Sequence, residues 1–273
     1  YWGVQGVLRI MESWTEDLPP IENIDFTNYS QESVMYAGDE STVLAEFRLE
    51  KREPLESADQ VSPYVLKGTV DTEDVRFYEH DGVDLLGIAR ALVNNLTGGD
   101  LEGASTITQQ LVRNTILTDE MDDISLKRKV REMYLSVKLE EKYSKNEILL
   151  MYLNTINYGN STYGIQAAAQ RYFSKDAADL TLAEAAALVG VPQSPSFNNP
   201  LVDDGQNCLK RRNLVLDRML SNGYITQEEH DAAQAEPLVV NESLPAEEGI
   251  YQYPHFVRYV KNLLTDPDGP YRY

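Results

Sequence analysis

Gly103-Ala-Ser-Thr-Ile-Thr-Gln-Gln110 is the stretch of this chain that says most about its fold. Gly103 and Ala104 suit a turn, and Thr106 with Gln109 three residues later matches a helix start in which hydroxyl and amide cap each other. Such a start carries free backbone N–H groups and the positive end of the helix dipole. It is therefore a natural cradle for an anion or for sugar hydroxyls.

Polar side chains continue along the predicted helix. Ser105 precedes its start, and Gln110, Arg113 and Asn114 follow it. Gln110 and Arg113 are three residues apart and share a face with Thr106, whereas the intervening apolar residues face the other way and pack. One face of this helix is thus expected to be polar and available to a ligand.

Two acidic sites and a cationic cluster flank this helix in the sequence. Glu73-Asp74 stands upstream, and the basic run 127–131 stands directly before Glu132. Arg128 and Lys129 lie four and three residues before Glu132, so all three can share one helix face. The cluster is either a solvated surface of ion pairs or a clamp for a pyrophosphate.

The segment 72–82 offers a further candidate if it is helical. In that case Glu73, Phe77 and His80 lie near one face, with Phe77 as the apolar anchor. A glutamate held beside a ring is partly desolvated and is a better base near neutral pH. The alternative is that the acidic pair simply favours a helix N-terminus through the macrodipole.

Composition limits the class of protein. The 273 residues are 42% hydrophobic and 25% charged, with a net charge of -20. That charge argues against nucleic acid as a partner, although the local positive patch still suits an anionic substrate. The single Cys208 allows no internal disulfide, and the three widely spaced histidines suggest no zinc site.

The pattern along the chain suggests three parts. Residues 1–62 form an acidic N-terminal segment with a β-hairpin, residues 63–235 a predominantly helical domain, and residues 236–273 a linker with a short amphipathic piece. Three further capping boxes and one buried helix are expected: Ser144 with Glu147, Thr181 with Glu184, Thr226 with Glu229, and the helix Leu182–Val191.

Together these stretches resemble the glycosyltransferase domain of class A penicillin-binding proteins, also known as peptidoglycan glycosyltransferase family 51. The resemblance covers residues 63–235. The motifs that carry it are Glu73-Asp74 with Phe77, His80 and Gly82; the stretch 103–110; Arg128-Lys129 with Glu132; Ile148-Leu149 with Tyr152-Leu-Asn154; and an echo of a fifth motif in Gly164–Phe173.

The resemblance implies a mainly α, lysozyme-like, two-lobed helical domain that polymerises lipid II into β-1,4-linked glycan strands by an inverting reaction. It implies Glu73 as general base, and Glu132 as the second catalytic residue, which orients the cations or a divalent ion and assists the leaving phosphate. The remaining residues implied to bind substrate or pyrophosphate are Arg113, Arg128, Lys129, Gln110, Ser105, Thr106, Asn114 and Asp74.

The resemblance also implies a setting. The expected partners are lipid II, the growing glycan strand, a membrane surface that the small lobe contacts, and cell-wall assembly proteins. The expected location is the outer face of the bacterial cytoplasmic membrane, with one N-terminal anchor and a C-terminal transpeptidase domain in the full-length protein. Moenomycin is the expected inhibitor. No cofactor is expected to be essential, and Mg²⁺ or Mn²⁺ is an option that the sequence leaves open.

Several positions depart from the family pattern, among them Ala104, Leu150 and Ser174. None removes a proposed catalytic group. Two alternatives remain at this point. One is a lysozyme-like enzyme that cleaves glycan, which would need no pyrophosphate clamp; the other is a non-catalytic module that binds lipid II.

Overall fold

The structure is a computed structural model. It describes residues 12–24, 33–39, 41–47, 54–97, 105–121, 123–240 and 254–265. The turn expected at Gly103 and Ala104 lies outside the described residues, so the account of the following helix begins at Ser105.

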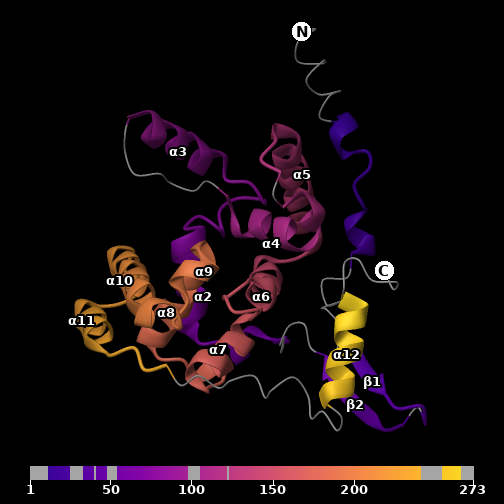
Figure 1. Ribbon diagram of the computed structural model, residues 1–273. Helices are drawn as coiled ribbons and strands as arrows, with labels where there is room; N and C mark the ends of the chain where they lie inside the picture. The colour runs from indigo at the N-terminus through magenta and orange to yellow at the C-terminus, as the bar shows by residue number, and fades with distance from the viewer. Residues whose placement is uncertain are drawn as a thin grey trace.

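The described chain is mainly helical, which confirms the expected fold class (Figure 1). The α-helices are α2 (Pro63–Glu73), α3 (Leu85–Thr97), α4 (Ile107–Thr115), α5 (Leu126–Lys142), α6 (Lys145–Thr155), α7 (Ile165–Phe173), α8 (Leu182–Gly190), α9 (Pro195–Asn198), α10 (Gln206–Ser221), α11 (Gln227–Ala235) and α12 (Pro254–Thr265). Short 3-10 helices are η1 (Ile21–Asn23), η2 (Ala58–Gln60), η3 (Thr118–Glu120), η4 (Ala177–Asp179), η5 (Val191–Gln193) and η6 (Asp203–Gly205).

Four helices begin at the capping residues that the sequence predicts. Side-chain capping boxes form at Thr106, Ser144, Thr181 and Thr226, each with the acid or amide three residues on. Each hydroxyl accepts from a backbone N–H that the helix leaves unpaired, and the partner side chain returns to the cap. The four expected starts are confirmed.

The core is built around α8, which packs against both α2 and α10. Ala185, Ala186 and Ala187 are buried, and their small side chains let the neighbouring helices approach closely. Gly68 of α2 serves the same purpose, because a Cβ there would lie 3.3 Å from Met219 Sδ of α10. The buried helix expected at 182–191 is confirmed, with its last residue in η5.

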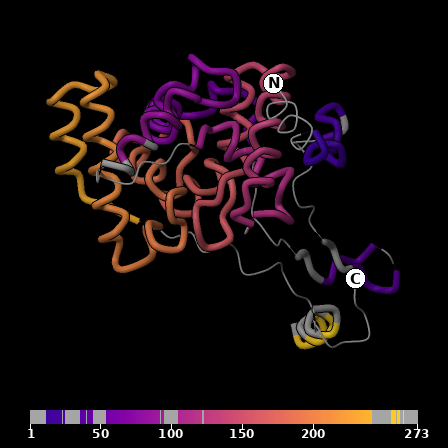
Figure 2. The backbone as a smooth tube through the Cα atoms, turned by 90° about the horizontal axis from the view of Figure 1, so that it is seen from above, coloured from indigo at the N-terminus to yellow at the C-terminus, as the bar shows by residue number. Residues whose placement is uncertain are grey.

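A two-stranded antiparallel hairpin precedes the helices. β1 (Ser33–Tyr36) pairs with β2 (Val43–Phe47), with Met35 opposite Ala45. The hairpin was expected here, with its second strand one residue longer. The hairpin and α12 lie to one side of the helical body (Figures 1 and 2).

Residues 12–24 lie along α5 (Figure 1). Arg131 of α5 binds two residues of this segment. Its guanidinium donates to the carbonyl of Trp14 over 2.9 Å and pairs with the carboxylates of Asp17 and Glu120. The Arg131 side chain is almost fully buried. Part of the acidic N-terminal segment is therefore packed against the helix that carries Glu132.

Apolar side chains are exposed on α3 and just before α5. Leu85 and Leu86 are 70% and 66% exposed, and Ile124 is 95% exposed. None of the helices in the described part of the chain has the length and apolar character to cross a bilayer. Leu85, Leu86 and Ile124 are thus apolar side chains on the surface of the molecule.

Candidate active site

Glu73 is the last residue of α2, and the chain leaves the helix at Asp74. The condition that 72–82 is helical is therefore not met, and the alternative of a helix N-terminus at the acidic pair is wrong. Phe77 is fully buried, and its ring contacts Tyr78, His80 and Lys145. The shared face expected for Glu73, Phe77 and His80 does not form, because the helix ends before Phe77.

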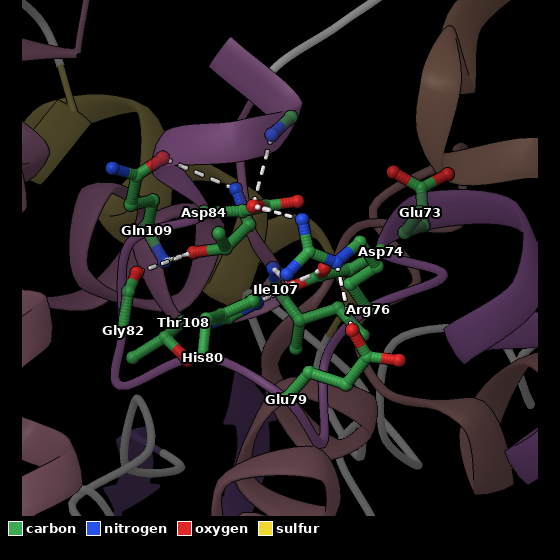
Figure 3. Close-up of polar contacts among 12 residues, drawn as sticks. Glu73, Asp74, Arg76, Glu79, His80, Gly82, Asp84, Ile107, Thr108 and Gln109 are labelled. Atoms are coloured by element: carbon green, nitrogen blue, oxygen red, sulfur yellow. Dashed lines mark hydrogen bonds and ion pairs between the residues drawn. The ribbon is translucent and has the colours of Figure 1, made fainter. Parts of the chain in front are cut away.

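Asp74 holds two separate segments together. His80 Nε2 lies 3.0 Å from both of its carboxylate oxygens, and the backbone N–H of Ile107 donates to Oδ2 over 3.1 Å. Asp74 therefore occupies the positive end of α4 that was expected to receive a ligand. Figure 3 shows this cluster, with the Glu73 carboxylate pointing away from it.

Thr106 is likewise committed to the fold. Its hydroxyl accepts from the N–H of Gln109 and donates to the carbonyl of Gly82 over 2.7 Å. Gly82 has φ +86°, and a Cβ there would lie 2.6 Å from the carbonyl oxygen of Ser136, so only glycine fits. Thr106 and Asp74 thus set the position of α4, and both residues are buried.

Glu73 is bound by the polar face of α4. Gln110 Nε2 donates to Glu73 Oε2 over 2.9 Å, and Gln110 Oε1 accepts from the hydroxyl of Tyr152 over 3.2 Å. Burial raises the pKa of Tyr152 and of Tyr158, and the charge of Glu73 adds to both increases. Two neutral phenols and one amide therefore surround a carboxylate that is only partly buried.

Glu132 forms the second acidic centre, and its side chain is completely buried. Arg128 Nη1 pairs with Oε2 over 2.5 Å, and Lys129 Nζ pairs with Oε1. Lys129 Nζ also donates to Ser105 Oγ over 3.0 Å and to Gln109 Oε1 over 3.3 Å. The carboxylate thus orients both cations, as expected, and Lys129 connects them to the start of α4.

Arg113 and Asn114 lie at the other end of α4 and are half-buried. The charge of Arg113 lowers the pKa of Tyr152 while Glu73 raises it, so Arg113 and Glu73 both lie near this hydroxyl. Within the part of the chain that the structure describes, neither the Arg113 nor the Asn114 side chain has a hydrogen-bond or ion-pair partner. Arg113 therefore presents a positive charge close to Glu73.

The fourth motif is mainly structural. Asn154 accepts from the backbone N–H of Leu55 and donates to its carbonyl, both over 2.9 Å. Tyr172 of α7 donates to the carbonyl of Tyr158 over 2.8 Å. These contacts fix the end of α6 and place Tyr152 and Tyr158 beside Glu73.

The motifs of the sequence do not include three residues in and directly after α10 that lie near the end of α2. Arg218 donates to the carbonyl of Thr72 over 2.8 Å, and Asn222 donates to the carboxylate of Asp71. Arg211 lies close enough to Glu73 for their charges to interact. The available signal was the spacing of seven residues between Arg211 and Arg218, which places both on one helix face.

A divalent ion at the site would need oxygen or nitrogen ligands from several side chains. Within the described residues, no group of three or more His, Cys, Asp and Glu side chains could hold a metal. Both oxygens of Glu132 and both of Asp74 already accept from protein groups.

Comparison with known proteins gives the family. The model of the transglycosylase family matches residues 40–220. Penicillin-binding protein 1A of Escherichia coli is 38% identical over 99% of this chain, which spans 31% of that protein. Penicillin-binding protein 1A of Haemophilus influenzae is 47% identical over 73% of this chain, which spans 23% of it. A crystal structure of the latter covers 86% of this chain at 25% identity, with a TM-score of 0.49 and 25% of its own chain matched.

The chain therefore belongs to the transglycosylase family, and the expectation of a peptidoglycan glycosyltransferase domain like those of class A penicillin-binding proteins is confirmed. It spans only about a third or less of the length of these relatives.

Proposed function

We propose that this chain polymerises lipid II, an undecaprenyl-pyrophosphoryl disaccharide-pentapeptide, into β-1,4-linked glycan strands and releases undecaprenyl pyrophosphate. The main support for the proposal is that one helix, α4, connects the two acidic centres Glu73 and Glu132. Gln110 of α4 binds Glu73, and Gln109 of α4 binds Lys129, which holds Glu132. A base and a cationic cluster on one scaffold suit a reaction that deprotonates one substrate and expels a pyrophosphate from another.

Glu73 is the general base in this proposal. It takes the proton from the 4-hydroxyl of the acceptor N-acetylglucosamine, whose oxygen attacks the anomeric carbon of the donor N-acetylmuramic acid. The bond from that carbon to pyrophosphate breaks, and the configuration inverts. A positioned base typically contributes ~10²–10⁴-fold to the rate. Gln110 fixes one oxygen of Glu73 and leaves the other for the acceptor.

Arg113, Arg128 and Lys129 meet the charge that develops on the leaving pyrophosphate. Fixed cations stabilise such a transition state because they need not reorganise during the reaction. Glu132 holds Arg128 and Lys129 by opposite oxygens, so their remaining N–H groups keep a set direction. Ser105, which accepts from Lys129, and Asn114, which follows Arg113, are proposed to contact substrate.

The exposed apolar side chains near α3 support contact with a membrane surface, where the lipid tail of the substrate resides. Leu85, Leu86 and Ile124 would enter the interface while the acidic remainder stays in water. This location is proposed as the outer face of the cytoplasmic membrane. The growing strand would leave from the side of the site away from the lipid.

The decisive test is incubation of the chain with fluorescent lipid II in detergent, with and without moenomycin, followed by gel analysis. A ladder of long glycans that moenomycin abolishes supports the proposal. Glu73→Gln should then remove nearly all product with the fold retained, whereas Glu79→Gln, an exposed neighbour, should not. Cleavage of preformed glycan without a ladder would favour the hydrolase, and binding without either activity would favour the non-catalytic module.

A further inference from the structure

Helix α3 (Leu85–Thr97) projects from the helical body in Figure 1. Among the described elements it has no extensive packing contact with another helix, whereas α8 packs on both α2 and α10. Gly87 and Ala91 are buried, four residues apart on one side of the helix. Leu86 and Val93 share another side, which points outward, and are 66% and 58% exposed. The orientation of α3 therefore depends strongly on the contacts of its first turn.

Asp84 caps this first turn. Its Oδ1 accepts from the backbone N–H of Gly87, and its carbonyl accepts from that of Ile88, both over 2.9 Å. A Cβ at position 87 would overlap the Asp84 carboxylate, so the glycine leaves the space in which the carboxylate lies. The Asp84 side chain is only 10% exposed. Its carboxylate is thus fixed at the start of α3.

Arg76 binds the same carboxylate from a different segment of the chain. Its Nη1 donates to Asp84 Oδ1 over 3.2 Å, and its Nε donates to Glu79 Oε2 over 2.8 Å. Figure 3 shows the guanidinium between the two carboxylates. Glu79 is 65% exposed, so the bond to Asp84 is the one that the protein shields from water. An ion pair shielded in this way is weakened less by salt than one on the surface.

The segment that carries Arg76 begins directly after the proposed base. Asp74, the residue after Glu73, accepts from the backbone N–H of Ile107 at the start of α4. The carbonyl of Gly82 accepts from the first turn of the same helix. The segment 74–82 is therefore attached to α4 near both of its ends, and the Arg76 side chain connects it to α3.

We propose that Arg76 and Asp84 are positioning residues of the transferase site, whose ion pair sets the orientation of α3, as the helix that contacts the membrane, relative to the segment that follows Glu73. The inference rests on the proposed function and its membrane contact. The apolar chain of lipid II holds the substrate in the membrane, so its sugars lie at a limited height above that surface. Because α3 contacts the same surface, its orientation decides where Glu73 lies relative to the acceptor hydroxyl. A misplacement of about 1 Å can cost about 100-fold in rate.

Two variants break the ion pair from opposite sides. Arg76→Met keeps an apolar stem and removes every donor. Asp84→Ser keeps a hydroxyl that can cap the helix but is too short to reach the guanidinium. Glu79→Ser is the matched control, since it removes the other carboxylate bound to Arg76, which is exposed and does not contact α3. Circular dichroism checks the fold of each variant, and Asp84→Ser decides where Arg76→Met is unfolded.

Amide hydrogen exchange, followed by mass spectrometry with and without phosphatidylcholine vesicles, measures the connection directly. Neutral lipid avoids repulsion of a chain whose net charge is -20. In the wild type and in Glu79→Ser, vesicles should slow exchange in both α3 and the segment 74–82. In Arg76→Met and Asp84→Ser, α3 should still be protected while the response of 74–82 is lost. The rate of lipid II polymerisation in the same vesicles should fall by about 10-fold or more in these two variants only.

The connection is disproved by a wild-type response of 74–82 to vesicles in either folded variant, or by no response of this segment in the wild type. Unchanged polymerisation in both folded variants would likewise overturn the role of the pair in positioning. Absence of protection of α3 in the wild type would overturn the membrane contact, and the inference with it. Failure of the wild type to polymerise lipid II would overturn the proposed function, whereas the exchange pattern decides the connection between α3 and 74–82 independently.

Discussion

The side-chain amide of Gln110 donates a hydrogen bond to the carboxylate of Glu73, with 2.9 Å between Nε2 and Oε2. The same side chain accepts from the Tyr152 hydroxyl, so its orientation is fixed from both ends. A hydrogen bond to a charged group contributes about 1.5–3 kcal/mol. Gln110→Ala should therefore lower kcat for lipid II polymerisation by roughly 10- to 100-fold. Tyr152→Phe, which removes only the outer hydrogen bond, should have a smaller effect, and the reverse order would contradict this geometry.

Asp74 is expected to contribute mainly to the stability of the fold. Asp74→Ala removes the partner of both His80 and the Ile107 N–H and should lower the free energy of unfolding by about 1–3 kcal/mol. Urea denaturation measures the change, with Asp81→Ala at an exposed neighbouring position as control. If stability is unchanged while lipid II binding is lost, Asp74 contacts substrate after all.

Glu132 neutralises two cations inside the protein. Glu132→Ala leaves Arg128 and Lys129 facing each other without a carboxylate, and removing one partner of a buried pair costs about 3–5 kcal/mol. We expect a large loss of stability together with loss of activity. Glu141→Ala breaks an exposed pair with Lys138 on the same helix and should change the denaturation midpoint little. Similar midpoints for the two variants would refute the buried role of Glu132.

His230 gives a pH-dependent contribution at the contact of α10 and α11. Two hydrogen bonds raise the pKa of His230 above its usual value. The bond to Asp217 has the larger effect, and the bond to Asp231 the next largest. Its stabilising effect is therefore fully present below about pH 6.5, the ordinary value, and is lost as pH rises through the folded value. Urea unfolding of wild type and His230→Gln should differ more at pH 5.5 than at pH 9. A difference independent of pH would show that the charge of His230 contributes nothing.

Cys208 is expected to be inert in the folded chain. It is completely buried, and burial raises the pKa of its thiol to about 12. At pH 8 the thiolate fraction is then on the order of 10⁻⁴, and the thiolate is the reactive form. Iodoacetamide should label the chain only after urea is added, as mass spectrometry can show. Since the chain has a single cysteine, rapid native labelling would directly disprove the burial.

Local rules explain what the sequence could predict. The caps at Thr106, Ser144, Thr181 and Thr226 depend on residues three apart, so the local sequence was enough to predict them. The packing of α8 follows in the same way from its run of small apolar residues.

Other features depend on contacts between residues far apart in the sequence, so the local pattern could not predict them. The pattern at 72–82 suggested a helix, but the Asp74 carboxylate binds the N–H of Ile107 and His80, and α2 ends before it. Likewise, nothing near Glu73 in sequence reveals Arg211, which only the packing of α10 on α2 brings close.

The attachment of residues 12–24 to α5 limits how many N-terminal residues can be removed from this protein without disturbing α5. A version that starts at residue 54 would retain every motif of the site yet leave Arg131, the neighbour of Glu132, without Asp17 and the Trp14 carbonyl. Loss of function after such a truncation would then report a disturbed α5 and would say nothing about substrate contacts. Protein engineers should therefore choose the first residue of the domain upstream of Trp14.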